Sequence, residues 1–212
     1  MPRPGMMWRH VIVSTHRSWL HGDQRGFRSR GHRIHSSGDY KDPPPLGEHA
    51  ELLAYQQKHL KGKKVKIAPA LRGEVGLALL RAVLKAGYRV LVIAVTQKHA
   101  HLLVELPKSR KLVNQIVGKW KTARTTKLRR AMRGTIWGEG GKFKPVRNRE
   151  HLRAAYKYVR DDQGAGAWVW DYRNGVPEEV QQLLARDAEP AGTSHPQAEG
   201  AAQRSPGFLG QR

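Results

Sequence analysis

Two histidines separated by a single residue, His99 and His101, lie within an apolar run that starts at Val90. Side chains two positions apart on an extended strand point to the same face, so we expect the two imidazoles to project together. Neutral imidazole nitrogens are common ligands of divalent metals. Further along the chain, a helical segment carries Tyr158, with Asp162 one turn later. In a very basic chain, this combination predicts metal-assisted phosphodiester chemistry on nucleic acid.

Each of these signals also has an ordinary structural explanation. The chain contains 11 histidines, so a pair at this spacing arises easily by chance and fits two strand residues that face solvent. Leu103 continues the histidine side toward the core, which favours a site instead. A single tyrosine on a helix is most often a half-buried amphipathic residue. Tyr156 shares the apolar stripe of its helix with Leu152 and Val159 and is expected in the core, whereas Tyr158 lies off that stripe.

Charge is the dominant property of the composition. Lys and Arg total 39 against 17 Asp and Glu among 212 residues, for a formal charge of +22. Such a field attracts polyanions, and phosphate contacts supply most non-specific affinity for nucleic acid. The chain has no cysteine, which excludes disulfides and cysteine-based zinc sites. It also has no apolar run of the roughly 20 residues that span a bilayer and no signal-peptide-like segment. We therefore expect a cytoplasmic, nucleoid-associated protein without membrane contact.

Apolar periodicity predicts an alternation of strands and helices. Strands are expected over 8–15, 89–96 and 98–106, helices over 48–60, 72–86, 109–132 and 148–162, and short extended segments over 135–137, 143–146 and 167–172. The two central strands form a hairpin if Gln97 and Lys98 make the turn, although a bulged or longer connection fits equally well. Neighbouring hairpin-like strands favour an α+β fold, in which helices cover one face of a mainly antiparallel sheet.

One domain accounts for most of the chain. We expect it to span 1–180, with a long basic loop over about 16–47, followed by a disordered tail over 185–212 that is rich in Ala, Gly, Pro, Ser and Gln.

At this point the residues resemble a known family. The segment Ala94–Pro107, a strand with His-x-His followed by Leu-Leu-Val, looks like the metal-binding strand of the IS200-like single-tyrosine ("HUH") transposases. The segment Lys157–Gln163 looks like their nucleophile helix. The basic helix between these segments, and Ile136-Trp137-Gly138 ahead of the tyrosine, follow the order of the family. The resemblance covers about residues 8–172 and extends to the REP-associated tyrosine transposases.

The resemblance implies a ferredoxin-like, RRM-like domain that nicks and rejoins single-stranded DNA through a 5′-phosphotyrosine. Carried over by position, Tyr158 is the nucleophile, and His99 and His101 hold a divalent metal. The third ligand of the family is usually an Asn or Gln four residues after the tyrosine, where this chain has Asp162 with Gln163 beside it. Hard cations prefer oxygen ligands, so a two-histidine site fits Mn²⁺ at least as well as Mg²⁺.

The basic residues predict how the DNA is held. Those expected to contact a single strand, which could be folded as a hairpin, are Arg25, Arg28, Arg30, Lys119, Lys121, Arg124 and Lys127. A solvated helix face explains the four of them on the helix over 109–132 equally well. Trp120 or Trp137 is expected to stack on a base.

Three other functions fit parts of the pattern. A non-catalytic nucleic-acid-binding protein on the same scaffold is expected to carry aromatic side chains on its sheet face. A replication-type or relaxase-type nickase shares the histidine pair and the tyrosine. A metal-dependent hydrolase that uses water would not need Tyr158. The active form could be a monomer, or a homodimer in which each tyrosine serves the partner's histidines.

Overall fold

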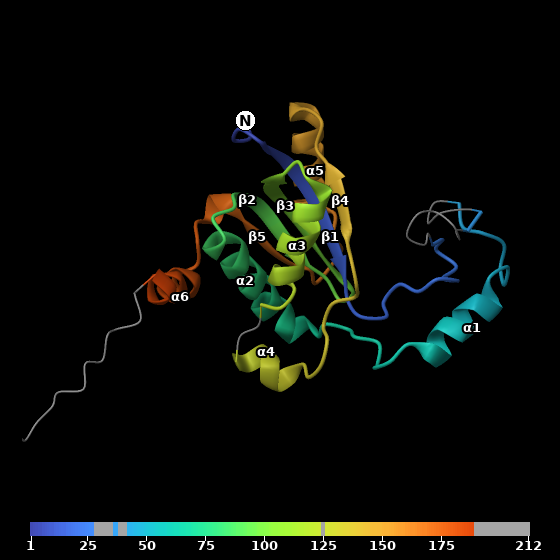
Figure 1. Cartoon of the computed structure of the whole chain (residues 1–212). Helices are drawn as coiled ribbons and strands as arrows, with labels where there is room; N and C mark the ends of the chain where they lie inside the picture. Colours follow the sequence, from blue (N-terminus) through green and yellow to red (C-terminus); the bar gives the residue numbers. More distant parts are fainter. Residues whose placement is uncertain (28–35, 38–41, 124–125, 189–212) are drawn as a thin grey trace, which may run out of the picture.

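One antiparallel sheet organises the chain in the computed structural model, which describes residues 1–27, 36–37, 42–123 and 126–188. The strand order is β4-β1-β3-β2-β5 (Figure 1). The strands are β1 (Met6–Ser14), β2 (Val90–Val95), β3 (His99–Pro107), β4 (Lys142–Pro145) and β5 (Trp168–Asp171). The expected α+β class with an antiparallel sheet is confirmed, and every expected strand from 8–15 onward has a counterpart except 135–137. That segment forms only an isolated bridge between Thr15 and Trp137.

The histidine strand β3, the second strand of the β2–β3 hairpin, is the central strand of the sheet. Its connection is longer than two residues: the backbone N–H of Thr96 donates to the His99 carbonyl at 2.9 Å. The Thr96 hydroxyl accepts from the backbone N–H groups of Lys98 and His99 at 3.3 and 3.2 Å. A threonine side chain that bonds nearby backbone groups stabilises a turn without glycine. This turn fixes His99 at the first position of β3.

Six α-helices lie within the described residues. They are α1 (Ala50–His59), α2 (Pro69–Lys85), α3 (Arg110–Trp120), α4 (Thr126–Ala131), α5 (Arg149–Asp161) and α6 (Glu178–Ala188). The single helix expected over 109–132 is divided, because α3 ends at Trp120 and the chain turns at Thr122. The helix α6 was not expected. Its last turn includes residues 185–188, so the predicted tail begins too early, and the rest of that tail lies outside the described residues.

The main hydrophobic core lies on one face of the sheet, under α2 and α3. Alternate residues of β3 enter it, among them Ala100, Leu102 and Val104, with Leu80 and Val83 from α2. The helix α2 approaches β5 closely because position 76 is glycine: a Cβ there would overlap the ring of Trp168. Most of the buried apolar residues of the described chain belong to this cluster.

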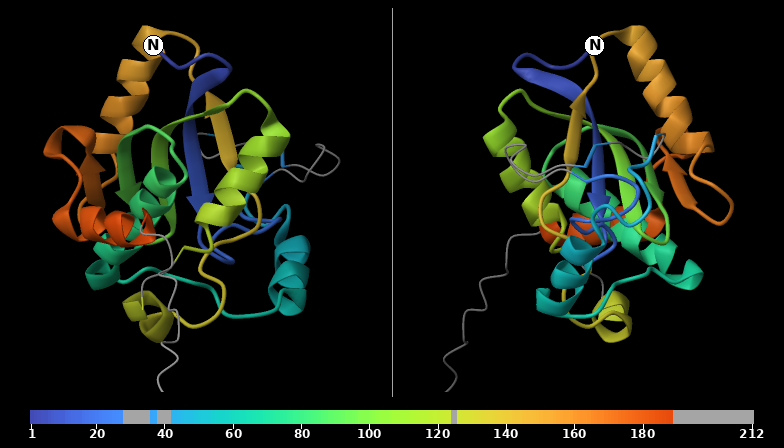
Figure 2. Two further views of the ribbon diagram at one scale, coloured as in Figure 1. Left: turned by 60° about the vertical axis from the view of Figure 1, so that its left-hand side comes forward. Right: turned by 90° about the vertical axis from the view of Figure 1, so that its right-hand side faces the viewer.

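A second, smaller cluster lies on the opposite face, where α5 packs. It joins Ala155 and Val159 of α5 to Val92, Ala94 and Leu103 of the sheet. The right-hand view of Figure 2 shows α3 and α5 on opposite sides of the strands. The expectation of helices on one face therefore holds for α2 and α3, and α5 adds partial cover to the other face.

The segment expected as a long basic loop forms a separate lobe around α1, which stands away from the sheet (Figure 1). We call the described residues 16–27, 36–37 and 42–64 the α1 lobe. Phe27 is buried within it, with its ring edge-on to His49 at 4.9 Å between centroids. The guanidinium of Arg17 donates to the carbonyls of Gly62 and Gln57 at 2.5 and 2.6 Å, which ties the start of the lobe to its end.

Among the helices of the described ranges, none combines the length and the apolar character needed to cross a bilayer.

Candidate active site

Three histidines from two neighbouring strands lie on the face of the sheet that carries α5. In the β1–β3 register, Ile12 pairs with His101, Ser14 with His99 and His10 with Leu103. Because side chains alternate along a strand, His10, His99 and His101 share one face. The rings of His99 and His101 are 4.7 Å apart between centroids, so the structure brings this expected pair together. No local sequence pattern predicted that His10 would lie beside them.

A hydrogen bond within this cluster connects the two strands. Nε2 of His10 and Nδ1 of His101 are 2.8 Å apart, and their rings stack with centroids separated by 5.1 Å. The other nitrogen of His101, Nε2, is buried and has no hydrogen-bond partner. Buried polar atoms nearly always have a partner, and a bound ion or a water is one that would satisfy this nitrogen. If the Nδ1 atom of His101 donates to His10, the Nε2 atom carries a free lone pair, as a metal ligand must.

Tyr158 reaches the same cluster from α5. Its ring lies 5.7 Å from the rings of both His10 and His101 between centroids, edge-on to each, and 44% of its surface remains exposed. The helix begins at Asn148, whose side chain accepts a hydrogen bond from the backbone N–H of His151. The buried residues Ala155 and Val159 fix the rotation of α5 against the sheet. Tyr158, off that stripe, is left at the edge of the covered surface.

The neighbouring tyrosine has a structural role. Tyr156 packs against the second cluster, and its hydroxyl donates to the carboxylate of Asp171 on β5. The side chain of Arg173 lies over the Tyr156 ring, 5.4 Å from its centroid. Helical periodicity assigned Tyr156 to the core and Tyr158 to the site, and their positions are consistent with that choice. The hydroxyl of Tyr156 is hydrogen-bonded to Asp171, whereas Tyr158 lies at the histidines.

Burial keeps the three imidazoles neutral. It is the largest cause that lowers the pKa of His101 to about 2 and that of His10 to about 4, and the charge of Lys144 adds to both shifts. The pKa of His99 is also lowered, first by burial and then by the charges of Lys98 and Arg25. A neutral imidazole with a depressed pKa is a poor proton acceptor, but it is in the protonation state that binds a metal.

The two residues considered as a third metal ligand lie at the C-terminal end of α5. Asp162 caps the helix, and its backbone N–H donates to the Tyr158 carbonyl. The side-chain amide nitrogen of Gln163 donates to the same carbonyl at 2.7 Å. Among the described residues, no group of three or more His, Cys, Asp or Glu side chains is spaced to hold a metal ion. The structure thus assembles the histidine pair but does not bring Asp162 into a three-ligand group with it.

The residues present nevertheless fit a divalent metal in part. A bound cation would accept the lone pair of the buried, unpartnered Nε2 atom of His101. His99 supplies a second imidazole, whose ring centroid lies 4.7 Å from that of His101. Phosphate oxygens and water can complete the coordination of a hard cation.

The predicted DNA-contacting residues are divided by the structure. Lys119 is exposed on α3. Lys121 donates to the Gly138 and Gly140 carbonyls, and burial lowers its pKa. Lys127 is 2.8 Å from the Glu74 carboxylate. Arg25 is ion-paired with Asp23. These partners leave Lys119 as the predicted contact best placed in solvent, while Arg28, Arg30 and Arg124 lie outside the described residues.

The expectation that Trp120 or Trp137 stacks on a base is wrong. Trp120 is 3% exposed and Trp137 is 5% exposed, and both belong to the main core. The ring of Trp120 packs edge-on against Tyr88. Because both side chains are buried in the core, neither offers an open ring face to a nucleotide.

Sequence reasoning missed two residues of the cluster, His10 and Lys144. Lys144 of β4 pairs with His10 in the β1–β4 register, so it lies on the same face. Neither strand is close in sequence to the hairpin that carries His99 and His101. Only the pairing of β1 between β3 and β4 brings them together, and no local pattern predicts that pairing.

Comparison with known proteins yields one distant likeness. No family model and no curated protein matches the chain. Among solved structures, a REP-associated tyrosine transposase bound to a REP hairpin aligns over 97% of this chain and 96% of its own, at 14% identity and a TM-score of 0.36. A likeness of this size assigns neither a family nor an activity to the chain, so its function is argued from its own side chains.

Proposed function

We propose that the protein cleaves and rejoins single-stranded DNA through a covalent bond between Tyr158 and a 5′-phosphate. One observation carries the proposal: the half-exposed ring of Tyr158 lies against His10 and His101, where a buried imidazole nitrogen has no partner. A nucleophile beside a ready metal-ligand atom is the combination that phosphoryl transfer requires.

The reaction at Tyr158 is a balanced exchange of phosphoester bonds. The tyrosine oxygen attacks phosphorus while the bond between phosphorus and O3′ breaks, which gives a 5′-phosphotyrosine and a free 3′-hydroxyl. The hydroxyl proton of Tyr158 passes to solvent, which reaches the exposed part of the ring, and the departing O3′ takes up a proton. Because a phosphodiester is exchanged for another phosphodiester, a new 3′-hydroxyl can reverse the step without ATP.

The histidines would hold Mn²⁺ or Mg²⁺ at this position. His101 and His99 offer their imidazoles, with Asp162 or Gln163 as a predicted third ligand. When bound, such a cation polarises a non-bridging phosphate oxygen and offsets the charge of the in-line transition state. His10 holds the His101 ring in place through the hydrogen bond between their nitrogens. The charge of Lys144, on the same face, attracts the phosphate.

A single strand suits this site better than a duplex. A nucleophile on a helix that packs against a sheet reaches a phosphodiester only if the strand can lie across that face. The formal charge of +22 supplies the long-range attraction for such a polyanion. A DNA hairpin that displays a single-stranded flank is the form of substrate we expect.

The decisive experiment is covalent trapping. Purified protein is incubated with Mn²⁺ and a pool of single-stranded DNA hairpins labelled at the 3′ end, since the 3′ fragment keeps the 5′-phosphate. We expect a labelled protein band on a denaturing gel. Tyr158→Phe should reduce it to background, His101→Ala should reduce it strongly, and Tyr156→Phe should keep it as the matched control.

Three results would contradict the proposal. An adduct that survives Tyr158→Phe would place the nucleophile elsewhere. Cleavage without an adduct, retained in Tyr158→Phe, would indicate a hydrolase that uses water. Binding of hairpins without any cleavage would indicate a non-catalytic DNA-binding protein.

A further inference from the structure

Trp19 is the exposed tryptophan of this chain. All six tryptophans lie in the described part of the sequence. Four of them, Trp8, Trp120, Trp137 and Trp170, are at most 9% exposed. Trp168 is partly buried against α2, where its ring lies over Gly76. Trp19, in contrast, keeps 40% of its surface open at the start of the α1 lobe. A large aromatic ring left in solvent marks a surface for a flat or apolar ligand.

The Trp19 ring is held in one orientation. Its indole N–H donates to the Gly26 carbonyl at 3.0 Å. The guanidinium of Arg25 lies over the ring, 4.4 Å from its centroid. That guanidinium is itself fixed, because it donates to Asp23 at 2.7 Å and to the Ser18 carbonyl at 3.0 Å. The ring and the guanidinium are therefore oriented before any ligand binds, which lowers the entropic cost of binding.

The two cations near Trp19, Arg25 and Lys142, differ in how well they can bind a phosphate. Asp23 neutralises Arg25, so this guanidinium serves as a flat stacking group more than as a phosphate ligand. The ammonium of Lys142, on β4, also lies over the Trp19 ring, 5.2 Å from its centroid. A base on the ring would thus have a cation from a separate strand close to its phosphate.

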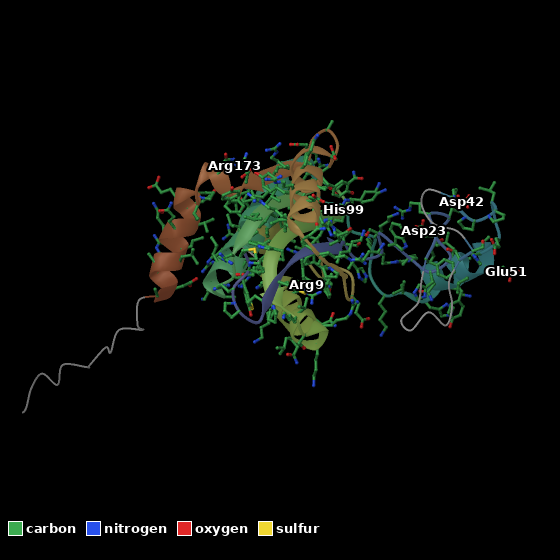
Figure 3. All side chains as sticks on the ribbon, turned by 90° about the horizontal axis from the view of Figure 1, so that it is seen from above. Arg9, Asp23, Asp42, Glu51, His99 and Arg173 are labelled. Atoms are coloured by element: carbon green, nitrogen blue, oxygen red, sulfur yellow. The ribbon has the colours of Figure 1, made fainter. Side chains whose placement is uncertain are left out.

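Trp19 is connected to the histidine cluster by β4. Lys142 and Lys144 are two residues apart on that strand, so their side chains share a face. Lys144 pairs with His10, whose ring contacts Tyr158. In the view of Figure 3, Asp23 lies between His99 and Glu51, on the part of the α1 lobe nearer to the sheet.

We propose that Trp19 is a base-stacking platform for single-stranded DNA, and that Lys142 and Lys144 guide the backbone of the same strand from Trp19 to Tyr158. The contact with Trp19 stands on its own geometry; the direction of the strand toward Tyr158 rests on the proposed function. The α1 lobe then contributes to substrate binding through an aromatic ring, in addition to its charge.

Intrinsic fluorescence in EDTA tests this platform without any catalysis. The full-length chain is titrated with oligo(dT) of about a dozen nucleotides, within the range of single-strand sites. Because the other five tryptophans are buried or partly buried, we expect the quenching to come from Trp19. Trp19→Leu should abolish most of it and weaken binding about 5- to 100-fold, the range expected for one stacked base. Trp19→Phe should stay within about 5-fold of wild type, since a smaller ring still stacks.

Two controls separate stacking from a general loss of aromatic surface. Tyr55 is 57% exposed on α1, where its ring stacks on His59. Tyr55→Leu should bind oligo(dT) as the wild type does. A blunt DNA duplex, which offers no unpaired base, should cause little quenching. Equal affinity of Trp19→Leu and wild type for oligo(dT), or equal quenching by the duplex, would overturn the platform.

Its failure can be distinguished from failure of the proposed function. If Trp19→Leu loses oligo(dT) affinity while no covalent adduct ever forms, the platform stands as a binding site and the cleavage chemistry is wrong. If adducts form at Tyr158 with an unchanged KM in Trp19→Leu, the chemistry stands and the platform is wrong. If both proposals hold, Trp19→Leu raises KM for hairpin cleavage and leaves kcat close to that of the wild type.

Discussion

The two faces of β3 belong to one strand but contribute very differently to the stability of the fold. On one face, Ala100, Leu102 and Val104 enter the main core under α2 and α3. On the other, His99, His101 and Glu105 alternate with them, and α5 covers only part of the surface. Apolar burial of the first face stabilises the fold at roughly 25 cal/mol per Å² of buried apolar surface. On the second face, polar groups at defined positions replace part of the apolar surface, so its burial stabilises the fold less.

Glu105 and His101 show how differently that second face treats its buried polar residues. The Glu105 carboxylate accepts hydrogen bonds from both Arg3 and Arg89, and mainly the bond from Arg89 lowers its pKa to about 2. His101, four residues earlier, keeps one nitrogen without a partner. Both side chains are buried, so only His101 bears an uncompensated cost of burial. At the Glu105 end of this face the buried carboxylate thus has hydrogen-bond partners, whereas at the end where Tyr158 lies a buried imidazole nitrogen lacks one.

The largest effect on stability should come from the apolar face. Leu102→Ala removes a side chain that is 1% exposed in the main core and should lower the free energy of unfolding by about 2–5 kcal/mol. Urea denaturation measures this loss. Leu112→Ala, at a position 47% exposed, is the matched control and should change stability by about 0.5 kcal/mol or less. A loss at Leu102 no greater than at Leu112 would mean that this face is not the main core.

Acid should weaken the fold through the histidine face. The folded pKa values of His10 and His101, about 4 and about 2, lie below the unfolded value of 6.5. Between pH 6.5 and 5 the unfolded state therefore binds more protons, and stability falls as the pH falls. We expect a loss of about 3 kcal/mol over this range for the pair, before carboxylates titrate. Urea midpoints in EDTA measure it, and a flat profile would contradict the burial of neutral imidazoles.

The sequence predicted the parts of the molecule that depend on local pattern. Two apolar runs located β2 and β3, and a connection longer than Gln97-Lys98 was one of the two alternatives for their turn. Helical periodicity separated Tyr156 from Tyr158, because a stripe of 3.6-residue spacing defines which side of α5 packs. These features follow from residues within one or two turns of each other, where periodicity is informative.

Features that depend on long-range pairing could not be predicted. His10 joins the cluster only because β1 pairs with β3 in one register. Trp120 shares a helical stripe with Val113 and Val117, which is a local sign of burial, but the many Lys and Arg residues of this segment suggested exposure. Trp137 belongs to no such stripe. Trp19 stands in a stretch read as loop, yet its ring is fixed by Arg25 and Gly26. The partners of His10 and Trp120 come from segments distant in sequence. Those of Trp19 are near in sequence, but they belong to a loop, whose conformation periodicity does not describe.

The next smaller expected effect is the change in metal affinity when His10 is replaced. If His10 orients His101 for a metal, His10→Leu should weaken Mn²⁺ binding by about 10- to 100-fold, as losses of ligand-orienting hydrogen bonds do. His10→Gln offers a carbonyl oxygen as acceptor and should recover much of that affinity. Calorimetric titration with Mn²⁺ measures both variants. Equal losses in the two would indicate that His10 acts through packing alone, and no change in either would separate it from the site.

The smallest change in stability should come from replacing both hydrogen-bonded histidines. His101→Leu alone leaves Nε2 of His10 buried without its partner and should cost about 1–3 kcal/mol at pH 7. The double variant His10→Leu/His101→Leu removes both polar groups, so its stability should lie within about 1 kcal/mol of wild type, and its loss between pH 6.5 and 5 should be much smaller. Denaturation of the two single variants and the double variant completes the cycle. A double variant less stable than either single one would mean that the fold itself depends on the histidines. A double variant as stable as wild type but unable to form the DNA adduct would show that the two imidazoles serve the chemistry and are not needed for the stability of the sheet.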